Sequence, residues 1–440
     1  MMRALQRSVL VCAALPAIGA LTSLAAAPIP VVWSYRPAGA EVNSSFGSLH
    51  FQEDVALLQD RGHTIGDPVI GLDLSSGRER WRLGPVSSYD VRFGGAVFTA
   101  PLSGRLHVFE AVTGRDLGAL LPNGDEARVL SIVAREIYAT TDNSLVRIDN
   151  PGSLVWNTRF SDLSAGRPNE HDLNCSVIGE RVYVSISGPQ PGLSALDRGN
   201  GRVLWKHGSL YADNMDIGRD VRALPEGLLL AETAGATSRS IGMLSLLDPD
   251  TGRVRARYPA QGALGLNGVP GGVVFGDYAG RIFRTSMIAG RGVWYYSSFN
   301  LAEGNIYPDD ISMQVTLLSN DDERVYFVAA LTNQNALVAL SVETGATVWR
   351  FSPPGLSPAQ AVIQGDARTL TLNGLVYSFW MDRAGRALLV AVDAGSGLER
   401  GRSAPLPGSF ADEMRGPYLH NGALYGLLGD RLVRFSPLAR

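Results

Sequence analysis

The sequence predicts an all-β fold, a propeller of small four-stranded blades, and three observations lead to this prediction. A strand–turn–strand unit recurs along the chain. Glycine (50 residues) and proline (24 residues) are more frequent than in an average globular protein, as many tight turns require, and there is no G-X-Y period of collagen. No apolar period of 3.6 residues follows the first 27 residues, which argues against helices.

The recurring unit is an alternating strand ending in an acid, a four-residue turn closed by glycine, and a second strand. It is clearest in VIGLDLSSGRERW (69–81) and LSALDRGNGRVLW (193–205). Glycine at the end of a tight turn adopts positive φ without a Cβ clash. The acid of the unit can accept hydrogen bonds from the turn N–H groups. We expect the tryptophan of the second strand to pack between neighbouring sheets and to keep its N–H for a partner.

This unit occurs at eight glycines, 37 to 55 residues apart, and tryptophan stands four residues after five of them. The repeat positions are Gly77, Trp81, Gly114, Gly152, Trp156, Gly201, Trp205, Gly252, Gly290, Trp294, Gly345, Trp349 and Gly397. Further alternating runs lie upstream of each turn, so each unit contains about four short strands. That is the size of one propeller blade.

The two ends of the chain are expected to form one more blade together. The segment VVWSY (31–35) resembles an outermost strand without its turn, whereas residues 423–427 and 432–435 resemble inner strands without an outer partner. Pairing these segments would close the ring and leave no bare sheet edge. The count is then eight self-contained units and one composite blade.

The unit LVALSVETGATVW (337–349) is similar to the A-L-D-x-x-T-G-x-x-x-W repeat of the PQQ-like (pyrrolo-quinoline quinone) β-propellers. The resemblance covers about residues 30–436. This family includes the quinoprotein alcohol dehydrogenases and the propeller lipoprotein of the outer-membrane β-barrel assembly machinery. The resemblance implies eight blades, and the units at Gly114, Gly252 and Gly397 lack the tryptophan. We therefore predict eight blades, with nine as the alternative.

Residues 1–27 are predicted to be a secretory signal peptide, followed by a single propeller domain over residues 28–440. A basic start, an apolar run and an alanine-rich end are typical of such a signal. Because proline follows residue 27, cleavage is expected after Ala25 or Ala26. An uncleaved anchor helix is the alternative, and lipidation of Cys12 stays open. No other segment of the sequence is long and apolar enough to span a membrane.

Charge and cysteine content exclude several functions. Removing the signal takes away Arg3 and Arg7 and changes the formal net charge from −3 to −5, which disfavours nucleic-acid binding. Cys175 is then the only cysteine, so an intramolecular disulfide cannot form, and the six histidines are scattered. The sequence also lacks a G-x-S-x-G elbow, a Walker A run and an H-E-x-x-H pair. We therefore predict no catalytic residues.

The resemblance raises the question of PQQ and Ca²⁺, which the catalytic members bind. In those enzymes PQQ lies between a ring of two adjacent cysteines and a tryptophan, beside Ca²⁺ and a catalytic Asp. This chain has no adjacent cysteine pair, and Trp294 and Trp380 are the tryptophans with aromatic neighbours. We expect no cofactor, with PQQ and Ca²⁺ as the alternative. Purified protein given both is expected to show neither tight binding nor dye-linked alcohol oxidation.

Acidic residues are frequent in the segments that enter the blades, close to the expected central channel. They are Asp90, Asp172, Asp213, Asp216, Asp309, Asp310 and Asp412. Solvated, turn-capping loop residues are the simplest interpretation. A negative surface for a basic partner and a set of Ca²⁺ ligands are the two alternatives.

Together these features predict an exported, non-enzymatic propeller of the periplasm, cell envelope or exterior that serves as a protein-interaction scaffold. Protein partners are expected on the loops of the rim, because a rigid frame holds them in place. We expect a monomer that binds no nucleic acid. The alternatives are a PQQ- and Ca²⁺-dependent dehydrogenase and an extracellular binder of small ligands in the axial channel.

Overall fold

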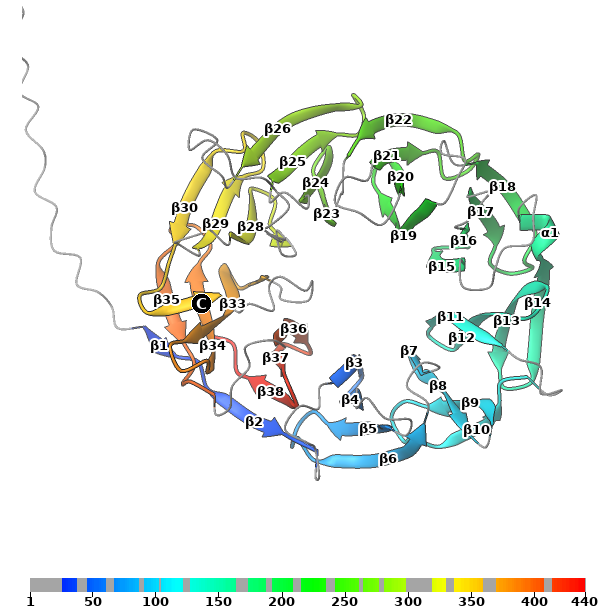
Figure 1. The fold of residues 1–440 in the computed structure, drawn as a ribbon, viewed down its shortest axis with the longest axis horizontal. Coiled ribbons are helices and arrows are strands. Elements are labelled where there is room, and N and C mark those ends of the chain that lie inside the picture. Colours follow the sequence, from blue (N-terminus) through cyan, green and yellow to red (C-terminus); the bar gives the residue numbers. More distant parts are fainter. Residues whose placement is uncertain are drawn as a thin grey trace, which may run out of the picture.

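The computed structural model describes residues 26–37, 46–60, 67–86, 91–102, 104–121, 127–163, 173–186, 192–208, 215–234, 242–260, 264–276, 281–297, 319–329, 336–358, 369–406 and 414–439. Within these ranges the chain forms nine sheets around a central opening (Figure 1). The predicted all-β propeller is therefore confirmed, and the alternative of nine blades is correct whereas the preferred number of eight is wrong. The units at Gly114, Gly252 and Gly397 each form a full sheet, because strand pairing does not depend on the tryptophan.

Blades 1 to 7 each contain four antiparallel strands, ordered from the central opening outward as they follow in the chain (Figure 1). Blade 1 contains β3 (Phe46–Gln52), β4 (Val55–Asp60), β5 (Asp67–Asp73) and β6 (Glu79–Val86). Blade 2 contains β7 (Arg92–Gly94), β8 (Val97–Leu102), β9 (Arg105–Glu110) and β10 (Asp116–Ala119). Blade 3 contains β11 (Arg128–Val133), β12 (Glu136–Thr140), β13 (Ser144–Asn150) and β14 (Ser153–Arg159). Blade 4 contains β15 (Leu173–Ile178), β16 (Arg181–Ile186), β17 (Gly192–Asp197) and β18 (Val203–Gly208).

The next three blades repeat this order. Blade 5 contains β19 (Met215–Leu224), β20 (Gly227–Ala234), β21 (Gly242–Leu247) and β22 (Val254–Pro259). Blade 6 contains β23 (Leu264–Val269), β24 (Gly272–Gly276), β25 (Arg281–Ser286) and β26 (Arg291–Ser297). Blade 7 contains β27 (Ser319–Asn320), β28 (Arg324–Ala329), β29 (Ala336–Ser341) and β30 (Thr347–Phe351). Between blades 3 and 4 lies α1 (Phe160–Leu163), the only helix in the described residues.

The last two blades join the two ends of the chain. Blade 8 contains β31 (Leu356–Pro358), β32 (Leu370–Leu372), β33 (Leu375–Asp382), β34 (Ala387–Asp393), β35 (Glu399–Arg402) and β1 (Ala27–Pro28). Blade 9 contains β36 (Met414–His420), β37 (Ala423–Leu428), β38 (Arg431–Phe435) and, as its outermost strand, β2 (Val31–Tyr35). Strand β2 pairs with β38, with Val31 opposite Phe435. The ring closure predicted from the sequence is thus confirmed.

Strand β1 was not foreseen from the sequence. It adds to the outer edge of β35 in parallel orientation, with Ala27 opposite Gly401. The backbone N–H of Ile29 donates to the carbonyl oxygen of Arg402 at 2.9 Å, and the Ile29 side chain is only 2% exposed. A Cβ atom on Gly401 would lie 2.4 Å from the carbonyl oxygen of Ala27, so this approach requires glycine. The N-terminal segment therefore holds blades 8 and 9 together.

The hydrophobic core lies between neighbouring blades, because each sheet buries both faces against the next. Between blades 1 and 2, Val55 and Leu57 pack with Phe98 and Phe109, and the two phenyl rings lie 5.1 Å apart. Similar clusters occupy the other seams. In the described part of the chain, no helix has the length and hydropathy of a membrane span.

Candidate functional site

The repeat glycines and tryptophans meet across the seams between blades. Trp81 of blade 1 lies against Gly114 of blade 2, where a Cβ atom would be 2.5 Å from the ring atom Cδ2. Its Nε1–H donates to the carbonyl oxygen of Val112 at 3.1 Å. We call this arrangement a clasp. The same clasp joins Trp33 to Gly77, Trp156 to Gly201, Trp205 to Gly252, Trp294 to Gly345 and Trp349 to Gly397.

Every third blade has no clasp with the blade that follows it. Blades 2, 5 and 8 carry Gly118, Ala256 and Gly401 at the position of the tryptophan. Gly152, which follows blade 2, has φ of 72° and no atom within 4 Å of a Cβ built on it. The ring is thus built of three sets of three blades, and the seams between the sets are packed without the indole.

The acids of the repeated turns have the expected role. Asp248 accepts the N–H groups of Asp250 and Thr251 at 2.9 Å each, and Arg255 binds its other oxygen at 2.5 Å. The hydrogen bond from Arg255, followed by those from Thr251, lowers the pKa of Asp248 to about 2. Asp73, Asp197 and Asp393 accept turn N–H groups in the same way. The turn at Asp248 therefore keeps its charge and its hydrogen bonds throughout the physiological pH range.

A cavity of about 590 Å³ lies between blades 4 and 5, at the end of the blades where these turns are found. Its walls come from the turn between β15 and β16, the turn between β19 and β20, and strands β16, β18 and β22. Apolar side chains form most of its surface, namely Ile178, Leu204, Leu224, Leu228 and Pro249. Such a concave apolar site with a few polar groups is typical of ligand or partner recognition.

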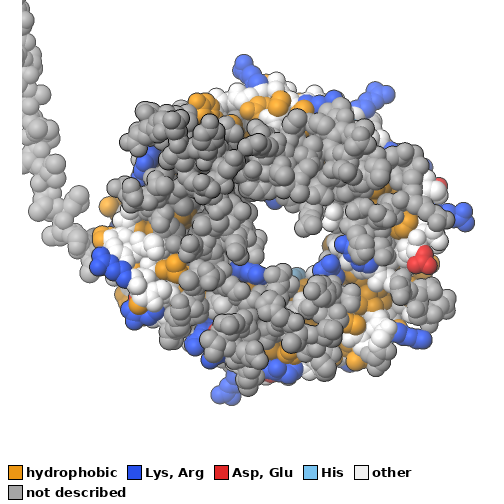
Figure 2. Space-filling model, in the orientation of Figure 1, with side chains coloured by type: hydrophobic (Ala, Val, Ile, Leu, Met, Phe, Trp, Pro, Cys, Tyr) orange, Lys and Arg blue, Asp and Glu red, His pale blue; other side chains and the backbone are white. Residues whose placement is uncertain are grey.

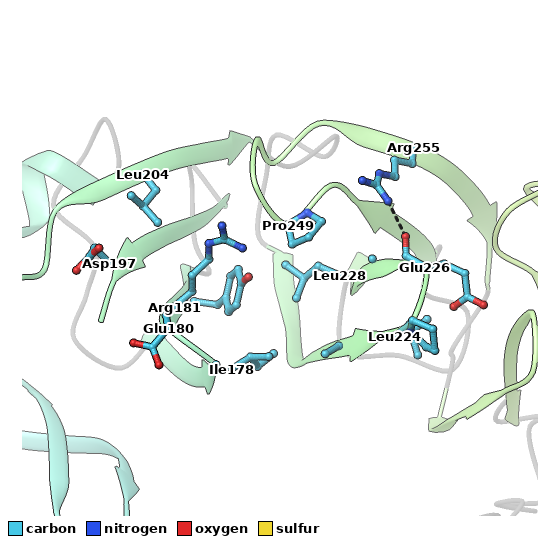
Figure 3. Close-up of a pocket in the computed structure, with 15 residues that line it drawn as sticks. Ile178, Glu180, Arg181, Asp197, Leu204, Leu224, Glu226, Leu228, Pro249 and Arg255 are labelled. Atoms are coloured by element: carbon cyan, nitrogen blue, oxygen red, sulfur yellow. Dashed lines mark hydrogen bonds between the residues drawn. The ribbon is translucent and has the colours of Figure 1, made fainter. Parts of the chain in front are cut away.

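Two arginines line this cavity: Arg255 is paired with Asp248, and Arg181 projects into the cavity. Figure 3 shows its guanidinium pointing into the space between the two blades, with Leu204, Pro249 and Leu228 around it. The carboxylates of Glu180 and Asp197 point away from that space (Figure 3). Partial burial would lower the pKa of Arg181, but hydrogen bonds with Asp250 and Tyr183 outweigh it and raise that pKa. The partner carboxylate, Asp250, is 73% exposed, so an incoming carboxylate can compete with it for Arg181.

The residues of this cavity were missed from the sequence. They come from two turns about 45 residues apart and from the strands around them, and neither turn contains a recognisable motif. The predicted channel acids Asp90, Asp172, Asp213, Asp309, Asp310 and Asp412 lie outside the described residues. The backbone of Asp216 lies in β19, opposite Thr233. The acidic channel therefore stays a prediction.

The described residues do not match the quinone clamp of the dehydrogenases. Trp294 packs in the clasp on Gly345, and Trp380 is buried in blade 8, with its Nε1–H bonded to Ser378 at 2.8 Å. Cys175 is partly buried among apolar side chains, and desolvation raises the pKa of its thiol to about 12. Within the described ranges, no three His, Cys, Asp or Glu side chains are placed to hold a metal ion.

The comparisons with known proteins concern the whole ring. The sequence model of the family described as outer membrane protein assembly factor BamB matches residues 66–350 and 242–405. No curated protein sequence matches the chain.

Among solved structures, BamB from Moraxella catarrhalis is 14% identical, with a TM-score of 0.46 over 93% of this chain and 100% of that one. Quinohemoprotein alcohol dehydrogenase from Comamonas testosteroni is 13% identical, with a TM-score of 0.49 over 94% and 77% of the two chains. Sqt1 from Saccharomyces cerevisiae is 9% identical, with a TM-score of 0.49 over 94% and 100%. At these values the structural likenesses carry no argument about activity.

Proposed function

Because the chain belongs to the family described as outer membrane protein assembly factor BamB, we propose that it is an exported, non-enzymatic interaction scaffold of the bacterial cell envelope. The family name concerns assembly at the outer membrane, where a propeller can serve by holding other proteins. The signal predicted in residues 1–27 supports export. A rigid ring with folded turns on one face supplies a broad surface that does not have to be ordered on binding.

The observation that carries this proposal is the cavity between blades 4 and 5. Its apolar walls fit an apolar side chain of a partner, and Arg181 would bind a carboxylate beside that side chain. A buried apolar contact next to a charge-assisted hydrogen bond is the usual composition of an interaction hot spot. We therefore propose a partner segment in which a Leu- or Phe-like residue lies next to an acid.

Exchange of Arg181 tests this site. Arg324 is a matched control, because it also begins the second strand of its blade and is also hydrogen-bonded to the tyrosine two residues later. Tagged wild type, Arg181→Ala and Arg324→Ala are isolated from envelope extract, and the co-purified proteins are quantified. We expect a specific envelope protein to be reduced at least tenfold by Arg181→Ala and less than twofold by Arg324→Ala. Equal recovery with all three proteins would contradict the site.

Export is tested on the same protein. N-terminal sequencing of the envelope form should return a chain that begins at residue 26 or 27. Recovery of Met1 would contradict a cleaved signal.

The rival function, a PQQ- and Ca²⁺-dependent dehydrogenase, is tested by adding both PQQ and Ca²⁺ to purified protein. Saturable PQQ binding with dye-linked alcohol oxidation would replace the scaffold proposal.

A further inference from the structure

The three seams without a clasp differ in what takes its place. Between blades 2 and 3 the backbones are joined directly. The N–H of Ala96 donates to the carbonyl oxygen of Ala134 at 2.9 Å, and the N–H of Gly152 donates to that of Leu120 at 3.1 Å. Between blades 8 and 9 the N-terminal segment bridges the seam, because β1 pairs with β35 of blade 8 and β2 pairs with β38 of blade 9. Each of these two seams therefore has a substitute for the indole.

The seam between blades 5 and 6 is held by packing. Among the described residues of β20–β22 and β24–β26, no hydrogen bond or ion pair joins the two blades. Ala256 stands at the tryptophan position, and a Cβ atom on Gly290 would face the carbonyl oxygen of Arg257 at 3.2 Å. Tyr258 lies edge-on to Phe275, with the ring centroids 6.2 Å apart. This ring contact replaces the clasp without bonding to the turn of blade 6.

The seams on either side are reinforced. Trp205 joins blade 4 to blade 5 by a hydrogen bond to the carbonyl oxygen of Pro249 at 2.8 Å, and Trp294 joins blade 6 to blade 7 by one to Val342 at 2.8 Å. These three seams follow one another around the ring (Figure 1). Figure 2 shows hydrophobic side chains at the surface of the outer rim, where Figure 1 places β22 and β26. Solvent therefore reaches the outer rim at the seam between blades 5 and 6.

Separating blades 5 and 6 also breaks no strand pairing. The backbone ladders of β20 and β21, and of β24 and β25, lie within one blade each. Only the side-chain contacts of the seam oppose separation, and a region with fewer such contacts opens at a lower free energy than its surroundings. A buried indole with a bonded N–H adds contact area and a directional bond, and this seam has neither.

We infer that the ring opens transiently at the seam between blades 5 and 6, which serves as its hinge. Blades 4 and 5 move together on one side of the hinge, because their clasp joins them. The cavity between blades 4 and 5 thus keeps its shape while blade 5 moves relative to blade 6. The inference does not rest on the proposed function.

Two neighbouring residues of β24 test the hinge, because they face opposite seams. Val273 and Val274 are both 0% exposed. Val273 belongs to the core between blades 5 and 6, and Val274 belongs to the core between blades 6 and 7. Each is replaced by cysteine, and its reaction with an excess of a chromogenic aromatic disulfide is followed by absorbance. The wild type, with its partly buried Cys175, gives the background rate.

We expect Val273→Cys to react at least tenfold faster than Val274→Cys. Unfolding of blade 6 would expose both positions equally, so the difference reports separation of the seam. Urea below the unfolding transition should change the rate of Val273→Cys only slightly, because local opening exposes little surface.

Strand β20 repeats the test from the other side of the seam, and it serves if a change in β24 prevents folding. Leu229 is 1% exposed and faces blade 6, whereas Leu228 is 2% exposed and faces blade 4. Leu229→Cys should react at least tenfold faster than Leu228→Cys. Trp205→Leu then removes the clasp between blades 4 and 5. It should accelerate Leu228→Cys at least fivefold and Leu229→Cys less than twofold.

Two results would overturn the inference. One is reaction of the two cysteines of a folded pair at rates that agree within twofold. The other is a rate of Val273→Cys that rises with urea as steeply as global unfolding does. Neither result bears on Arg181, so the scaffold proposal and this inference can fail separately.

Discussion

Substitution of Gly114 by alanine tests the clasp between blades most directly. Gly114 has φ of 68°, and its Cβ would lie 2.5 Å from the ring of Trp81. A left-handed conformation costs alanine about 1–2 kcal/mol. Displacing a packed ring adds an overpacking cost of about 1–3 kcal/mol. Together these effects should lower the free energy of unfolding by about 2–5 kcal/mol.

Gly152→Ala is the matched control for this substitution. Gly152 has nearly the same φ, 72°, but no atom lies within 4 Å of its Cβ position. Only the conformational cost of about 1–2 kcal/mol should remain. Urea unfolding followed by circular dichroism measures both variants. In a Trp81→Leu background the cost of Gly114→Ala should fall to that of Gly152→Ala. Equal costs for the two glycines in the wild-type background, within about 0.5 kcal/mol, would refute the clasp.

Two further predictions concern a partly buried histidine, His207, and the N-terminal segment. Burial lowers the pKa of His207 below its ordinary value near 6.5, so the unfolded chain binds the proton more tightly and stability falls as the pH drops below about 6.5. His207→Gln should therefore flatten the decrease of the urea midpoint between pH 7.5 and 5.5, and an unchanged decrease would contradict this origin. Ile29→Ala should lower the free energy of unfolding by about 2–5 kcal/mol, because the Ile29 side chain is buried in the core of blade 8. Val32 is 48% exposed, so Val32→Ala should lower the free energy of unfolding by less than about 0.5 kcal/mol. Thermal unfolding measures both variants, and similar losses for both would argue against docking of the N-terminal segment.

The local features of the fold could be predicted from the sequence because they are encoded within one unit. Positive φ at Gly77 and the hydrogen bonds accepted by Asp73 depend on four neighbouring residues. Ring closure could also be predicted, because the N-terminal segment resembles an outer strand without inner partners and the C-terminal segment resembles inner strands without an outer partner. The predicted number of eight blades is wrong because a blade is complete without the tryptophan. The tryptophan stabilises a seam, and strand pairing alone makes the blade.

Features that depend on contacts between two repeat units could not be predicted from the sequence. The partner of Trp81 is Gly114, which belongs to the next repeat, and nothing within one repeat indicates which glycine the ring contacts. The cavity beside Arg181 arises where two short turns of adjacent blades leave space, so it depends on how the sheets are stacked. The docking of Ile29 on blade 8 requires a glycine at position 401, some 370 residues away.

Ring closure also has a consequence for the order in which the molecule can be completed. Strand β2 is made among the first residues, and its partner β38 follows about 400 residues later. Blade 9 can therefore be completed only after β38 has been made, although the earlier blades can pair as they are synthesised. A chain that ends before residue 431 would keep β2 as an unpaired edge strand, open to aggregation or proteolysis. The pairing of β2 with β38 thus distinguishes chains that contain β38 from chains truncated before it.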